Sequence, residues 1–166
     1  MDRRYYHRAF SGATLQFQAS LCSTTNRPVD ATSGRHLVFE HGANVSQSDA
    51  RAWASEVFKR MWQSGMTAKF TAVTWRSDKG ADWNYHENVS NAFFTASAIA
   101  SDISALPGTK VLMAHSLGNM VCSSMIQDYE LVPACYLMGN SAGPAEAYDT
   151  DSSLRVPQLV HPEWVE

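Results

Sequence analysis

The apolar and polar positions of the chain change rhythm at regular intervals between residues 36 and 139. Short apolar runs, bounded by turn residues, predict strands at 36–42, 68–75, 109–115 and 133–139. Longer segments with apolar residues spaced by threes and fours predict helices at 46–65, 87–108 and 117–130. Strands that alternate with helices are typical of an α/β fold, with a mostly parallel sheet and helices on both of its faces.

The first predicted helix, at 46–65, has an apolar side and a candidate N-cap. Its apolar positions include Ala50, Trp53 and Ala54, which we expect on the face turned to the sheet. Ser48 precedes the periodic residues and is the expected N-cap, because its hydroxyl can accept a hydrogen bond from the first turn.

The two ends of the chain are less regular than its middle. Residues 13–21 alternate apolar and polar positions and predict a strand, whereas 22–35 form a polar segment typical of a loop. After residue 140 the pattern fades. We therefore expect one domain over 1–166, best defined at 36–140 and reduced or truncated at its C-terminal end.

The stretch "VLMAHSLGNM" places a serine between a predicted strand and a predicted helix. Ser116 has Ala114 two residues before it and Gly118 two residues after it. A sharp turn at this junction strains the backbone of a nucleophile and leaves space for only small residues at those two positions. The turn also lifts the hydroxyl to a helix N-terminus, where N–H groups favour an anion. The pattern predicts a nucleophile, and a helix-capping serine is the alternative.

Three stretches carry a family resemblance. "VLMAHSLGNMV" resembles the nucleophile elbow of the α/β-hydrolase superfamily, with alanine in place of the first glycine of G-x-S-x-G. "LVFEHGANVS" (37–46) is similar to the superfamily's strand followed by His-Gly. "FTAVTWRSDKGADWNYHENV" (70–89) is similar to a poorly characterised group of these hydrolases with an F-x-W-x-S strand end. The resemblance spans about 36–140 and implies an α/β-hydrolase-like fold and an esterase-like or lipase-like serine hydrolase.

The resemblance implies roles for residues around the serine. Ser116 would attack an acyl carbonyl, and the N–H groups of Ala43 and Leu117 would form the oxyanion hole. Such a donor stabilises the transition state by about 3–4 kcal/mol in other enzymes. His41 is expected to support the oxyanion loop by hydrogen bonding, and Gly42 lets the backbone approach closely.

Other residues near the motifs have two readings. His115 is expected to be a pocket wall or a packed side chain, and Asn119 to lie on the helix surface or behind the nucleophile. The aromatic residues Trp83 and Tyr85 fall in a polar segment after a strand. They could line a substrate pocket or anchor the loop.

A catalytic serine needs a base, which is usually a histidine held by a carboxylate. The superfamily's chain order is serine, acid, histidine, and His161 is the one histidine after Ser116. Asp149 is the expected acid, with Asp151 and Glu146 as alternatives. The complete fold has two more strands before its histidine, so the true acid and base could also belong to a C-terminal region absent from this sequence.

The expected activity is hydrolysis of carboxylic esters of small molecules, without a metal or cofactor. An acyltransferase or a lactonase would use the same elbow, since only the group that attacks the acyl-enzyme differs. A catalytically incomplete protein of this fold, with a binding role or weak activity, is a further alternative.

Composition narrows the possible partners and compartments. A net charge of −3 offers no basic surface for nucleic acid, and no apolar stretch is long enough to span a membrane. The N-terminus lacks the apolar run of a secretory signal, which predicts a cytoplasmic protein. Cys22, Cys122 and Cys135 fit no metal-binding spacing. If the sheet ends at 133–139, its bare apolar edge favours a homodimer.

Overall fold

The computed structural model describes residues 5–11, 14–16, 34–78 and 85–143. In this part of the chain, one six-stranded sheet has the order β2-β1-β4-β3-β5-β6. All neighbouring strands are parallel except β1 and β2, which are antiparallel. The strands are β1 (Tyr5–Ser11), β2 (Thr14–Gln16), β3 (Arg35–Glu40), β4 (Lys69–Thr74), β5 (Thr109–His115) and β6 (Cys135–Gly139). The helices are α1 (Gln47–Gln63), α2 (Tyr85–Ser104) and α3 (Gly118–Gln127).

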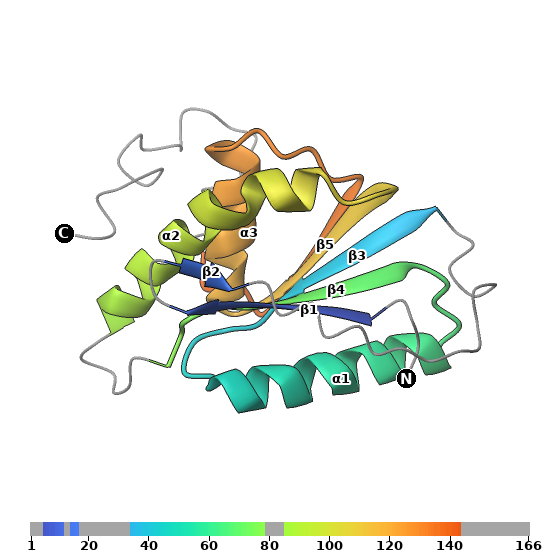
Figure 1. The fold of residues 1–166 in the computed structure, drawn as a ribbon, viewed down its shortest axis with the longest axis horizontal. Coiled ribbons are helices and arrows are strands. Elements are labelled where there is room, and N and C mark those ends of the chain that lie inside the picture. The colour runs from blue at the N-terminus through green and yellow to red at the C-terminus, as the bar shows by residue number, and fades with distance from the viewer. Residues whose placement is uncertain (1–4, 12–13, 17–33, 79–84, 144–166) are drawn as a thin grey trace.

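The connections distribute the helices over both faces of the sheet. The chain passes from β3 to β4 through α1, and then returns past β3 to reach β5 through α2. Right-handed crossovers in opposite directions place their helices on opposite faces. Accordingly, α1 covers one face, while α2 and α3 cover the other (Figure 1). The predicted α/β class, with a parallel sheet between two helical layers, is confirmed.

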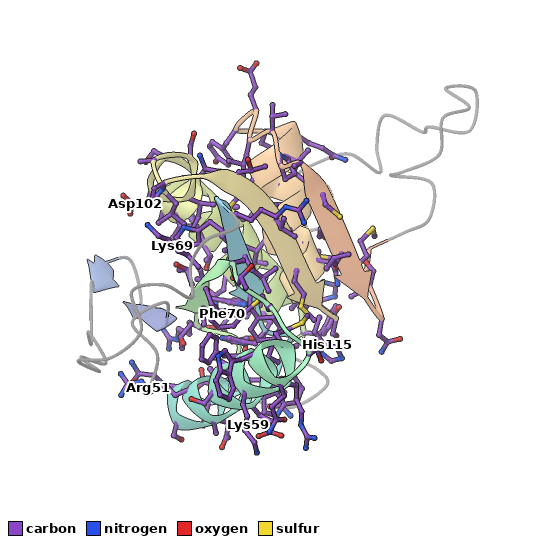
Figure 2. All side chains as sticks on the ribbon, turned by 90° about the vertical axis from the view of Figure 1, so that its right-hand side faces the viewer. Arg51, Lys59, Lys69, Phe70, Asp102 and His115 are labelled. Atoms are coloured by element: carbon purple, nitrogen blue, oxygen red, sulfur yellow. The ribbon has the colours of Figure 1, made fainter. Side chains whose placement is uncertain are left out.

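The face beneath α1 has a compact aromatic core. Leu37 and Phe39 of β3 and Phe70 of β4 pack there against Ala54 and Phe58 of the helix. The ring centroids of Phe58 and Phe70 are 5.4 Å apart. Figure 2 shows Phe70 between the sheet and α1, with Lys59 on the outer side of the helix.

The opposite face has a larger core with small residues at the helix contacts. Ala92, Ala96 and Ile99 of α2 are fully buried against the sheet and α3. Alanine at these positions lets the helix approach its neighbours closely, so that α2 and α3 lie side by side over the sheet (Figure 1).

The predicted strands and helices at 36–139 are all present, and their ends differ by a few residues. The N-cap prediction was wrong: Ser46, not Ser48, caps α1 and accepts a hydrogen bond from the N–H of Asp49. Trp53 is 44% exposed, and Ala54 and Phe58 form the buried side of the helix.

The N-terminal strands were predicted only in part. β1 was missed because its sequence, "YYHRAFS", carries charged and polar residues within a strand that pairs on both sides. The strand predicted at 13–21 is present as Thr14–Gln16, and 17–33 lie outside the described residues.

The strand β6 forms one edge of the sheet. Two of its apolar side chains are open to solvent, with Leu137 43% and Met138 42% exposed. The predicted homodimer would use this edge, and it stays a prediction. No helix in the described ranges is long and apolar enough to cross a membrane.

Replacing Ser46 by alanine is expected to lower the free energy of unfolding by about 1 kcal/mol, because the N–H of Asp49 loses its capping acceptor. Urea unfolding followed by circular dichroism measures this change. Ser48→Ala is the matched control and should change the free energy by no more than a few tenths of that amount. A larger loss for Ser48→Ala than for Ser46→Ala would contradict the observed cap.

Candidate functional site

The strand β5 turns sharply into α3 at Ser116. This residue has a φ of 51°, a left-handed conformation that costs a non-glycine residue free energy and is rare outside turns and functional sites. Its N–H donates to the carbonyl of Gly139 at 2.9 Å, and its own carbonyl accepts from the N–H of Ala142 at 3.2 Å. The side chain of Ser116 is partly exposed. The turn is therefore held by β6 and leaves the hydroxyl at the surface.

Small residues around Ser116 permit this turn. A methyl group added to Gly118 would lie 2.5 Å from the carbonyl oxygen of His41 and 2.8 Å from that of Glu40. The first turn of α3 thus rests directly on the end of β3, and only glycine fits there. Ala114, two residues before the serine, is also buried, at 1% exposure.

The loop that follows β3 touches the nucleophile candidate. A methyl group on Gly42 would lie 2.9 Å from Cβ of Ser116 and 3.1 Å from the carbonyl oxygen of His115. The loops after β3 and β5 lead to helices on opposite faces of the sheet, and ligands of open α/β sheets bind in the crevice between such loops. Within the described ranges, no hydrogen bond uses the N–H of Ala43 or of Leu117.

His41 is a buried support of this loop. Its Nε2 accepts a hydrogen bond from the backbone N–H of Trp75 at 3.1 Å, so the proton of the neutral ring is on Nδ1. Nδ1 donates to the carbonyl of Gly42 at 2.9 Å. The Trp75 indole stacks on the imidazole and donates from Nε1 to the carbonyl of His41 at 2.9 Å. With both nitrogens engaged and 1% exposure, His41 positions the loop and has no free nitrogen for a substrate.

Ser77 provides a second support that the sequence analysis did not single out. Its fully buried hydroxyl donates to the carbonyl of Val45 at 3.3 Å and lies 3.4 Å from Nδ1 of His41. Its carbonyl accepts from the N–H of Asn44. The signal was present in the W-x-S end of the strand, because Trp75 and Ser77 both hold the loop that touches Ser116.

Asn119 lies behind the turn at Ser116 and not on the helix surface. Its Nδ2 donates to the carbonyl of Ser116 at 2.8 Å and more weakly to that of Gly139 at 3.4 Å. Its Oδ1 accepts from the hydroxyl of Tyr136 at 2.8 Å. The amide therefore ties the turn to β6, and Tyr136 orients the amide.

Glu40 ends β3 as a fully buried carboxyl group. Neither of its oxygens has a hydrogen-bond partner among the described residues, and burial raises its pKa well above the usual value. The thiol of Cys122 on α3 lies near it, and its pKa is raised by burial and then by the Glu40 charge. A carboxyl without partners in an apolar core is stable only when protonated. Sequence reasoning missed it, although an acid within an apolar strand was visible.

His115 points to the α1 face of the sheet, opposite the side on which Ala114 packs. Its ring meets that of Trp53 edge to face, with centroids 5.4 Å apart. It thus packs against α1 beside the serine, and its second expected role, a pocket wall, stays a prediction.

The predicted base and acids fall outside the described residues. His161, Asp149, Asp151 and Glu146 all lie within 144–166, as Trp83 lies within 79–84. Tyr85, the first residue of α2, is 39% exposed. The described ranges contain no cluster of side chains suited to a metal ion.

The comparisons with known proteins returned no relatives. No family model, no curated protein and no solved structure matches this chain. The interpretation of the site therefore depends on its geometry.

Replacing Asn119 by alanine is expected to lower the free energy of unfolding by about 1–2 kcal/mol, because the Tyr136 hydroxyl loses its side-chain acceptor, keeping only the backbone carbonyl of residue 119, and the carbonyl of Ser116 loses a donor. Chemical denaturation measures the loss. Tyr136→Phe is the control that removes only the hydroxyl and should cost about 1 kcal/mol. Equal stability of Asn119→Ala and wild type would contradict the assigned role.

Glu40→Gln is expected to stabilise the protein increasingly as the pH rises. The pKa of Glu40 is higher in the folded than in the unfolded chain, so its contribution is complete below the unfolded pKa and is lost as the pH rises toward the folded one. The wild-type free energy of unfolding should fall relative to that of the variant by up to about 1.4 kcal/mol per pH unit in this interval.

Urea unfolding of both proteins between pH 5 and pH 8, roughly the range in which maximal stability is usual, measures this difference. Glu56→Gln is the matched control, because that carboxylate is exposed on α1 beside Arg60 and Lys59. A difference between wild type and Glu40→Gln that does not change with pH would show that the carboxyl is ionised or solvated in the fold.

Proposed function

We propose that this protein is a serine hydrolase of the α/β-hydrolase type, which cleaves carboxylic esters of small molecules. One observation carries the proposal: Ser116 adopts a strained left-handed conformation at a strand-to-helix turn, with the Gly42 backbone against its side chain. A serine that only capped a helix would have an extended backbone at the N-cap, as Ser46 has with a φ of −67° and a ψ of 162°.

The proposed reaction begins with attack of the Ser116 hydroxyl on the ester carbonyl carbon. The hydroxyl proton passes to the base, and the carbonyl oxygen becomes an oxyanion. The N–H groups of Ala43 and Leu117, which no hydrogen bond engages within the described ranges, would donate to this oxyanion. Collapse of the tetrahedral intermediate breaks the bond to the alcohol, which leaves with the proton from the base.

Water then attacks the acyl-enzyme and releases the acid. An acyltransferase would use an alcohol or amine in place of water, and a lactonase would open a cyclic ester by the same steps. The proposal favours hydrolysis because water needs no acceptor site of its own.

The identity of the base is the open part of the mechanism. His36 and His41 are buried and hydrogen-bonded, and Nδ1 of His115 is buried beside Gly42. His86 is exposed in the first turn of α2. We propose His161 as the base and Asp149 as its partner, as the chain order of the superfamily implies.

A protein without a working base is the competing proposal. No hydrogen bond joins a histidine to the Ser116 hydroxyl in the part of the chain that the structure describes. Such a protein would bind a ligand at the crevice and turn over esters near the background rate.

Labelling with a fluorophosphonate and hydrolysis of p-nitrophenyl acetate test the proposal together. Wild type should be labelled at Ser116, as peptide mapping would show, and Ser116→Ala should lose both labelling and turnover. His161→Ala should lower kcat by at least about 1,000-fold, because the hydroxyl loses its base.

His86→Ala is the matched control and should keep nearly wild-type kcat. A dead His86→Ala with an active His161→Ala would move the base to α2. Wild type that is neither labelled nor active would favour the incomplete protein.

A further inference from the structure

Trp53 lies at the surface of α1, although its neighbours on the helix are buried. Ala50, Ala54 and Phe58 face the sheet, while 44% of the Trp53 surface is open to solvent. A single exposed aromatic residue is common on protein surfaces and needs no explanation. The position of this one is informative because of the residue that it contacts.

The indole of Trp53 packs against His115, the last residue of β5 and the neighbour of Ser116. The ring centroids are 5.4 Å apart and the ring planes are inclined by 69°. On its other side, Nδ1 of His115 lies 3.2 Å from the position of a methyl group on Gly42. The imidazole therefore fills the space between α1 and the oxyanion loop, and Trp53 continues the same surface outward.

The start of α1 places Trp53 at the end of the sheet where β3 and β5 end, which is also the end that carries Ser116. The helix begins directly after the loop that contains Gly42, and Trp53 lies roughly 9 Å along its axis from Gln47. The indole thus packs on the side chain of His115, the residue that directly precedes Ser116.

We propose that Trp53 and His115 form an apolar wall of the substrate site, which receives a hydrophobic group of the ester. The inference rests on the proposed function and adds a substrate class: esters with an extended alkyl or aromatic group on the acyl or the alcohol side. Such groups gain affinity by covering the indole, whereas acetyl and ethyl groups are too short to cover it.

Two pairs of esters test the wall and distinguish the two sides of the ester. Ethyl acetate and ethyl hexanoate vary the acyl group, and ethyl acetate and 1-naphthyl acetate vary the alcohol. Trp53→Ala should lower kcat/KM about tenfold for the larger member of one pair, mainly through KM, because several methylene or ring carbons lose an apolar partner. The smaller members should change by no more than about twofold.

Two further variants control this experiment. Trp62→Ala removes a similarly exposed tryptophan, 52% exposed against 44% for Trp53, from the opposite side of the same helix and should leave both preferences unchanged. Trp53→Phe keeps a ring at the wall and should give an intermediate preference, which tests the wall even if Trp53→Ala does not fold.

Unchanged preferences in Trp53→Ala and Trp53→Phe, or the same change in Trp62→Ala, would overturn the inference while the proposed function stands. Wild type without fluorophosphonate labelling and without turnover would overturn the proposed function, and the inference with it.

Discussion

The close approach of the end of β3 to the turn after β5 is the constraint on which the site depends. The two segments approach each other closely at Gly42 and at Gly118. A methyl group added at either glycine would lie less than 3 Å from an atom of the other segment. Since the chain leaves β3 for one face of the sheet and β5 for the other, this approach has no helix across it. The closeness of the two segments is therefore a consequence of the topology and of the glycines at 42 and 118.

The strain in the Ser116 backbone is maintained by polar groups on three sides. The N–H of Ser116 donates to the carbonyl of Gly139. Its carbonyl accepts hydrogen bonds from the side-chain amide of Asn119 and from the N–H of Ala142. The loop opposite is fixed by Trp75 and Ser77 through His41. A left-handed serine costs on the order of 1–3 kcal/mol, and it persists only where such contacts determine its conformation.

The sequence predicted the central sheet and helices well because each element there has an apolar pattern of its own. It predicted the sharp turn at Ser116 because such a turn needs small residues at fixed positions, which Ala114 and Gly118 supply. It did not predict the buried supports, since a serine such as Ser77 or an acid such as Glu40 becomes informative only when its burial is known. The cap of α1 moved from Ser48 to Ser46 because both serines can cap, and only the start of the helix decides between them.

The two faces of the sheet place different groups beside Ser116. On the side of α3, the helix N-terminus and the N–H of Leu117 offer donors for an oxygen that becomes negative. On the side of α1, His115 and Trp53 offer apolar surface. An ester whose carbonyl oxygen is directed to the donors and whose hydrophobic group lies over the indole would present its carbonyl carbon to Ser116. The described chain contacts the Ser116 turn at Ala142, whose N–H donates to the carbonyl of Ser116, directly before the segment 144–166 that holds His161. This position in the chain supports the proposal of His161 over His86 of α2 as the base.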